Sequence, residues 1–123
     1  MAMDIVRDIH GVRALICRDE GAPLLREGDA NDFLSAAWAH DATLVAIPIA
    51  RLGDDFFRLR TRLAGEIAQK FVNYQIRLVI TGDIANWLVE SAALRDFVRE
   101  ANMGRALWFV ADLAELEARL LKG

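Results

Sequence analysis

The sequence contains few of the residues that usually form cross-links, metal sites or nucleophiles. Its 123 residues include one cysteine and two histidines. A single cysteine, Cys17, excludes an internal disulfide and is consistent with a reducing compartment. The spacings CxxC, HxxxH and HExxH are absent, so a zinc site would need ligands from separate parts of the chain. We therefore expect no metal ion and no other cofactor.

Long apolar runs and an excess of positive charge are also missing. The longest apolar stretches, TLVAIPIA at 43–50 and ALWFVA at 106–111, are far shorter than the roughly 20 residues that cross a bilayer. The net charge of −3 gives no general attraction to nucleic acid. The opening MAMDIVRD has acids where a signal peptide has a basic and then an apolar region. These features predict a cytoplasmic protein that binds neither membranes nor nucleic acid.

The chain does contain abundant apolar residues in a regular order. They make up 54% of the sequence, which is enough to form the core of one domain of this length. Two aliphatic runs flank His10-Gly11 and predict an opening hairpin. Continuous apolar runs at 43–49, 76–81 and 105–110 are typical of parallel strands that are buried on both faces.

Helical spacing separates and follows these runs. Asp29 is placed to cap a first helix, in which Phe33 and Trp38 are predicted to pack on the sheet. We therefore predict one α/β domain over 1–123, with the order β-β-α-β-α-β-α-β-α. Its sheet is expected to be mixed and mostly parallel, with an antiparallel hairpin at its edge. The second helix is predicted from apolar residues four apart, which are Leu59, Leu63, Ile67 and Phe71.

Two segments resemble a known family. They are DDFFRLRTRLAGEIAQKFVNYQIRLVITGD at 54–83 and LRDFVREANMGRALWFV at 94–110, over a third of the chain, and they look like the bacterial domain-of-unknown-function family 4180. That family has no assigned activity, so the resemblance implies a fold and a shared surface without a reaction.

The element order also resembles the STAS domains of sulfate transporters and anti-sigma-factor antagonists. The resemblance draws attention to Thr61, because STAS regulators carry a phosphorylatable hydroxyl residue near the start of the second helix. In those regulators an aspartate precedes this residue and small residues follow it. Here Arg60 precedes Thr61 and Arg62 follows it, so the sequence leaves open whether Thr61 is modified.

The segment TRLAGEIAQKFVNY, at 61–74, is the richest in polar candidates. If its helix begins near Asp55, the residues four apart form a ladder of mixed charge, which is the ordinary pattern of a solvent-exposed face. Gly65 stands out because glycine inside a helix costs about 1 kcal/mol relative to alanine. It predicts a close neighbour, which could be the sheet, another helix or a second subunit. The ladder comprises Arg58, Arg62, Glu66 and Lys70.

The hydroxyl of Thr61 has structural and functional interpretations. It could cap a helix that begins later than we expect, or bond back to a carbonyl one turn earlier. Alternatively, free amides at the helix start could form an anion site with Arg58, Arg60 or Arg62.

Three acids follow predicted strands. Asp83, in TGD, comes at the carboxyl end of a buried strand, where parallel sheets often bind ligands, although we favour its role as the cap of the next helix. Asp54 and Asp55, in LGDD, follow another strand and would line the same edge. The three could form a metal or acid–base cluster, but no spacing rule selects them.

Two functions of different classes remain. The one that we favour is a non-enzymatic regulatory or interaction domain of STAS-like type, whose surface binds a protein partner or a second copy of the chain. The alternative is a small-ligand-binding protein or hydrolytic enzyme that uses acids at the carboxyl edge of the sheet. We assign no catalytic residue. The candidate surface comprises Asp54, Asp55, Arg58, Thr61, Arg62, Gly65, Glu66 and Asp83.

Overall fold

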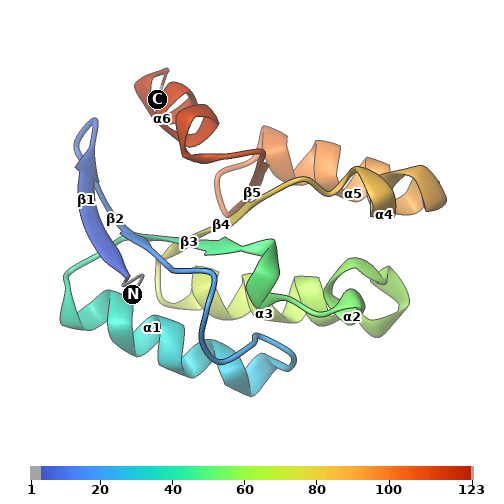
Figure 1. The fold of residues 1–123 in the computed structure, drawn as a ribbon, viewed down its shortest axis with the longest axis horizontal. Helices are drawn as coiled ribbons and strands as arrows, with labels where there is room; N and C mark the ends of the chain where they lie inside the picture. Colours follow the sequence, from blue (N-terminus) through green and yellow to red (C-terminus); the bar gives the residue numbers. More distant parts are fainter. Residues whose placement is uncertain (1–3, 123) are drawn as a thin grey trace.

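The computed structural model describes residues 4–122 and contains one five-stranded sheet (Figure 1). The strands lie in the order β1-β2-β3-β4-β5, with β1 antiparallel to β2 and all other neighbours parallel. This arrangement confirms the predicted mixed sheet with its opening hairpin. The strands are β1 (Ile5–Ile9), β2 (Val12–Ile16), β3 (Leu44–Pro48), β4 (Arg77–Thr81) and β5 (Leu107–Val110).

Helices connect the parallel strands and follow the last one. The order agrees with β-β-α-β-α-β-α-β-α, except that the second and third predicted helices are each divided. The α-helices are α1 (Ala30–Ala39), α2 (Asp54–Phe57), α3 (Leu63–Asn73), α4 (Ala85–Glu90), α5 (Ala92–Met103) and α6 (Leu113–Leu121). Three short 3-10 turns are η1 (Glu27–Asp29), η2 (Ile49–Arg51) and η3 (Leu59–Thr61).

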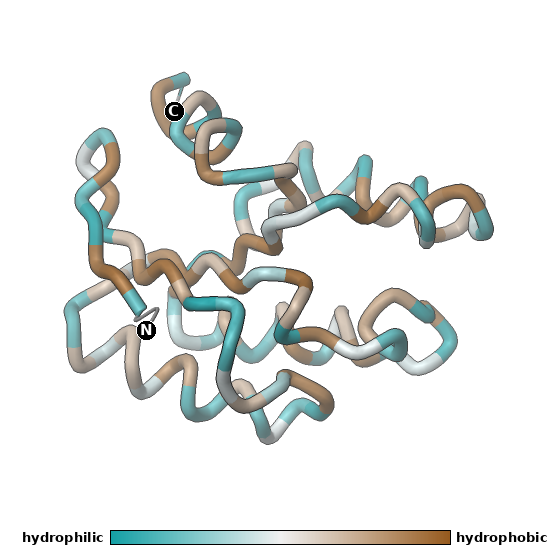
Figure 2. The backbone as a smooth tube through the Cα atoms, viewed as in Figure 1, coloured by the Kyte–Doolittle hydropathy of each residue, from teal (hydrophilic) through white to brown (hydrophobic). Residues whose placement is uncertain are grey.

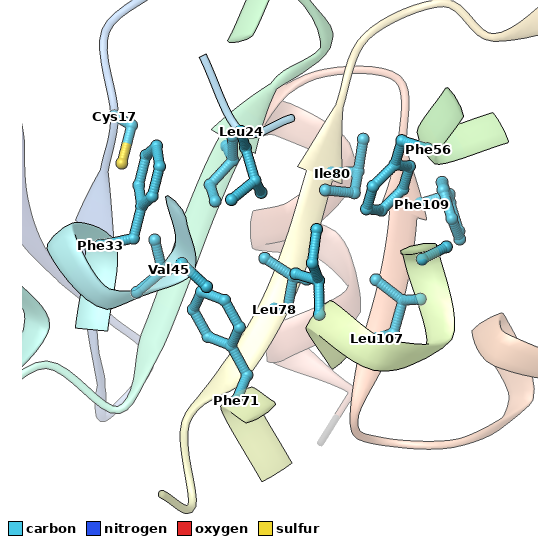
Figure 3. Close-up of a cluster of buried hydrophobic side chains, with 14 of the residues drawn as sticks. Cys17, Leu24, Phe33, Val45, Phe56, Phe71, Leu78, Ile80, Leu107 and Phe109 are labelled. Carbon is cyan, nitrogen blue, oxygen red and sulfur yellow. The ribbon is translucent and has the colours of Figure 1, made fainter. Parts of the chain in front are cut away.

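The larger core lies on the face of the sheet that α1, α3 and α5 cover. Parallel crossovers share one hand, so strands that follow one another in order place their connecting helices on the same face. In Figure 3, Val45 of β3 and Leu78 of β4 lie beside Phe33 of α1 and Phe71 of α3, and Phe109 of β5 lies beside Phe56. The helices therefore bury alternate residues of every central strand, including Val45, Leu78 and Phe109.

The opposite face has a smaller core beneath α6. Its strand residues include Leu44, Val79 and Trp108, which pack with Leu116 and Leu120 of α6. Figure 1 shows α6 across the sheet from α1 and α3. All residues of β3 are buried, and the central strands show hydrophobic colours in Figure 2. The continuous apolar runs thus reflect burial on both faces.

Local turn chemistry explains the hairpin. His10 and Gly11 have φ values of 49° and 85°, as a type I′ turn requires at both central residues. The predicted hairpin is confirmed.

Two predictions about the first helix are wrong in detail. The Asp29 carboxylate accepts hydrogen bonds from the amides of Leu25 and Arg26, so it stabilises the turn before α1 and makes no cap bond to the helix. Trp38 is 49% exposed and contacts the Tyr74 ring edge-on at 4.8 Å. In the last turn of α1, Trp38 packs on Tyr74, which directly follows α3, instead of on the sheet.

We predict that Gly82→Ala destabilises the fold by about 1–3 kcal/mol. Gly82 has a φ of 135°, and a Cβ there would lie 2.6 Å from Cγ1 of Ile49. Gly28→Ala is the matched control, because a Cβ at Gly28 meets nothing within 4 Å. Urea unfolding should show a shift for the first variant alone, and an equally stable Gly82→Ala protein would contradict the close approach.

Candidate functional site

The predicted second helix is broken at its amino-terminal end. Arg58 is extended after α2, and Arg62 has a left-handed conformation with a φ of 62° just before α3. The predicted charge ladder from Arg58 to Lys70 is therefore wrong, because these side chains do not lie on one continuous helix.

Burial of two adjacent aromatic residues explains the break. Phe56 and Phe57 are 1% and 4% exposed, and Phe57 stacks on Trp87 of α4 with the ring centroids 4.2 Å apart. In a continuous helix Phe57 would lie about 200° around from Leu59, on the solvent side. Interrupting the helix brings both rings into the core.

The three acids of the candidate surface have separate local roles. Asp54 and Asp55 form ion pairs with Arg58 at 3.9 and 3.3 Å. Oδ1 of Asp83 accepts a hydrogen bond of 2.9 Å from the amide of Ala85, at the start of α4. Residues 4–122 contain no group of three His, Cys, Asp or Glu that could hold a metal ion. The acids therefore do not form the cluster that their shared edge suggested.

Thr61 joins the two parts of the broken helix. Its hydroxyl donates toward the carbonyls of Asp55 and Arg58, with oxygen–oxygen distances of 2.7 and 2.8 Å. Its Oγ1 also accepts a 3.2 Å hydrogen bond from the amide of Leu63, the first residue of α3. The expected bond back to a carbonyl one turn earlier is confirmed. The expected capping role is not, because Arg62 is the N-cap of α3 and this helix has no side-chain cap bond. The hydroxyl proton of Thr61 is directed into the protein backbone.

Gly65 does not pack against the sheet or against another helix of this chain. It is exposed, and a Cβ added to it would meet nothing within 4 Å. Its neighbour Ala64 faces the core. The expectation of a close contact within the chain is wrong, and contact with a second molecule is the alternative that remains.

An open, mainly apolar groove of about 440 Å³ lies beside Gly65, between α3 and α5. Arg62 and Glu66 line it, and neither takes part in the ion pairs found within residues 4–122. The groove therefore combines a mainly apolar lining with one positive and one negative side chain, neither of which forms an ion pair within the described residues. Its remaining lining residues are Leu59, Ala64, Gln69 and Phe97.

Sequence reasoning missed a group of arginines at the edge where the strands begin. The guanidinium carbons of Arg77 and Arg119 lie over the Trp108 ring, 4.5 and 4.1 Å from its centroid. The charge of Arg105, like that of Arg119, lowers the pKa of Arg77. One signal was present in the sequence: Arg77 and Arg105 each stand at or just before a predicted strand, and neighbouring parallel strands begin at the same edge.

Cys17 and the buried charge of Arg51 have structural roles. Arg51 is 8% exposed, donates hydrogen bonds to the carbonyls of Arg18 and Ala22, and lies over the Phe33 ring. It thereby holds the loop before α1 against the core. Burial raises the pKa of the Cys17 thiol to about 12, with a smaller contribution from the charge of Asp4. Cys17 is therefore a protonated core residue at neutral pH.

The fold and these sites describe a single α/β domain with a five-stranded mixed sheet. The family model described as "Domain of unknown function (DUF4180)" matches residues 9–120. The chain therefore belongs to the DUF4180 family, as the resemblance of its central segments predicted. No curated protein and no solved structure matches the chain. Within the described residues, none of the helices has the length and apolar character needed to cross a membrane.

We predict that Thr61→Ala lowers the free energy of unfolding by about 1 kcal/mol, because it removes the hydroxyl that bonds the carbonyls of Asp55 and Arg58 and the amide of Leu63. Thr61→Ser keeps the hydroxyl and should retain most of the stability. Urea unfolding of the three proteins measures the difference. Equal stability of the alanine variant and the parent would contradict the linking role of the hydroxyl.

Cys17 should resist iodoacetamide in the folded protein at pH 8 and react after denaturation, because only the thiolate is nucleophilic. Since folding raises the pKa from 9.0 to about 12, ionisation favours the unfolded state. This contribution to stability is present below pH 9.0 and is lost as the pH rises toward 12. Rapid alkylation of the folded protein, measured by mass spectrometry, would contradict the assignment.

Proposed function

We propose that this protein is a non-enzymatic interaction domain of STAS-like type that acts in the cytoplasm, and that the groove between α3 and α5 is its partner surface. The observation that carries the proposal is Gly65, which lies exposed at this groove with open space above it. The order of helices and strands is compatible with a STAS-like arrangement.

The position of Gly65 favours close approach by another backbone. Glycine in the first turns of α3 costs about 1 kcal/mol relative to alanine, and no neighbour within the chain requires it. The absence of a side chain leaves the helix backbone uncovered, so that a second helix can pack closely against it. Half-buried Ala68, one turn later, extends the same surface of small residues.

The charges at the groove favour a second copy of the chain as the occupant. Arg62 and Glu66 both line the groove, Arg62 just before α3 and Glu66 in its first turn. In a two-fold dimer with antiparallel α3 helices centred near Gly65, Arg62 of one protomer comes within reach of Glu66 of its partner. The same pair then forms twice, because residue i contacts j and j contacts i in such an interface. The surface is thus complementary in charge to itself.

The alternative, a small-ligand-binding protein or hydrolytic enzyme at the carboxyl edge, has weaker support. Asp83 does line a cavity of about 310 Å³ near the ends of β4 and β5. Its carboxylate is used in the turn that begins α4, and Asp54 and Asp55 do not line this cavity. The Thr61 hydroxyl is also bonded to backbone carbonyls.

We predict that the parent protein is a dimer and that Gly65→Leu is a monomer, because the added side chain blocks close approach of the two helices. The folded monomer should not be destabilised, since leucine is the better helix former and has open space around it. Sedimentation equilibrium measures the mass, and urea unfolding measures the stability. Gly28→Leu is the matched control, because it adds the same side chain at another open position, and it should stay dimeric.

A charge reversal tests the proposed geometry. Arg62→Glu should weaken the dimer by placing like charges together, and Glu66→Arg in the same chain should restore it. If the double variant does not recover, the antiparallel arrangement is wrong. A parent that remains monomeric at concentrations up to about 100 μM would show that a second copy does not occupy the groove.

A further inference from the structure

A second cavity lies at the opposite edge of the sheet, where the parallel strands begin. It has a volume of about 350 Å³ and is lined by residues that come directly before or at the starts of β2, β3, β4 and β5 and by the end of α3. Its charged lining residues are Arg77 and Arg105, and no carboxylate lines it. The other lining residues are Val12, Thr43, Val72, Gln75, Ile76 and Ala106.

The two arginines have no counter-ion within the described chain. Among residues 4–122 neither guanidinium forms an ion pair, and neither donates a side-chain hydrogen bond. Partial burial lowers the pKa of Arg77, and the nearby charges of Arg105 and Arg119 lower it further. Three positive charges thus gather in a protein whose net charge is −3. An anion in the cavity would relieve their mutual repulsion.

Packing holds the cluster in place before any ligand arrives. Arg77 and Arg119 both lie over the Trp108 ring. The indole Nε1 of Trp108 donates a 2.7 Å hydrogen bond to the carbonyl of Gly104, and Arg119 donates to the carbonyl of Asn102. Arg119 is therefore anchored beside the cavity and adds positive potential, while Arg77 and Arg105 keep their donors free. Stacking on Trp108 preorganises Arg77, which reduces the entropy that binding must overcome, whereas Arg105 is exposed.

The geometry points to a small phosphate ester as the ligand, bound through Arg77 and Arg105. Guanidinium groups pair with two oxygens of a phosphate at once. Two of them match a phosphate monoester, which carries nearly two negative charges at pH 7, better than they match a single carboxylate. The Thr43 hydroxyl and the Gln75 amide line the same cavity and supply further polar groups.

The cavity's remaining walls suit the organic part of such an ester. Val12, Val72 and Ile76 are apolar, and the volume lies near the lower end of the range for small-molecule sites, roughly 300–1,000 Å³. The carboxyl end of α3 adjoins the cavity and has the unfavourable half-charge of the helix dipole there. That partial charge is smaller than the two full charges of Arg77 and Arg105, so the site remains favourable for an anion.

Titration calorimetry of the full chain with phenyl phosphate, inorganic phosphate and benzoate, at constant ionic strength, tests the proposal. Phenyl phosphate should bind most tightly, since it alone combines a dianion with an apolar group. Arg105→Gln should weaken it at least tenfold, about 1.4 kcal/mol, and Arg77→Lys should weaken it as well, because a lysine cannot pair in the same bidentate way. Arg105 is exposed and has no partner to lose, so its variant should fold like the parent.

Arg99→Gln is the matched control. It removes the same charge from α5, where Arg99 pairs with Asp96 outside the cavity, and it should bind phenyl phosphate as the parent does. If both Arg99→Gln and Arg105→Gln weaken the binding of phenyl phosphate equally, binding depends on the net charge alone, and the site is overturned. Tighter binding of benzoate would overturn the phosphate class, and equal binding of inorganic phosphate would overturn the role of the apolar walls. No binding of any of the three anions would overturn the proposal as a whole.

Discussion

The parallel alignment of β2 to β5 in the order of the chain is the constraint on which the rest of the structure depends. Because successive crossovers share one hand, α1, α3 and α5 gather on a single face and form the larger core there. The other face must then be covered by the helix left over, α6, beneath which the smaller core lies. An ion pair of 2.6 Å between Arg7 of β1 and Glu117 of α6 joins these two segments across that face. The division into a larger and a smaller core follows from the order of the strands.

The same constraint separates the two candidate surfaces. The groove beside Gly65 lies between α3 and α5, on the outside of the helical layer. The arginine cavity lies at the edge where the strands begin, since parallel strands bring their first residues together however far apart these are in the chain. A partner in the groove and an anion in the cavity would therefore contact different residues. Only α3 borders both, through Gly65 near its start and Val72 near its end.

Much of the fold could be predicted because each central strand is buried on both faces. An unbroken apolar run as short as that of β3, in a chain of this length, is typical of a strand between two layers of helices. The hairpin was also predictable, because His10 and Gly11 satisfy the geometry of a short turn. The candidate site was less predictable. Helical periodicity treats residues 55–73 as one helix, whereas Phe57 reaches the core only because the helix breaks after it.

The sequence by itself determined the order of strands and helices, the hairpin and the family, because these depend on local apolar spacing, turn residues and characteristic segments. Only the tertiary structure decided which charges meet. Arg7 of β1 pairs with Glu117 of α6, and Arg77 meets Arg119 over Trp108 because α6 crosses to the second face of the sheet. The arginine contacts join residues that are distant in sequence, and no local pattern specifies them.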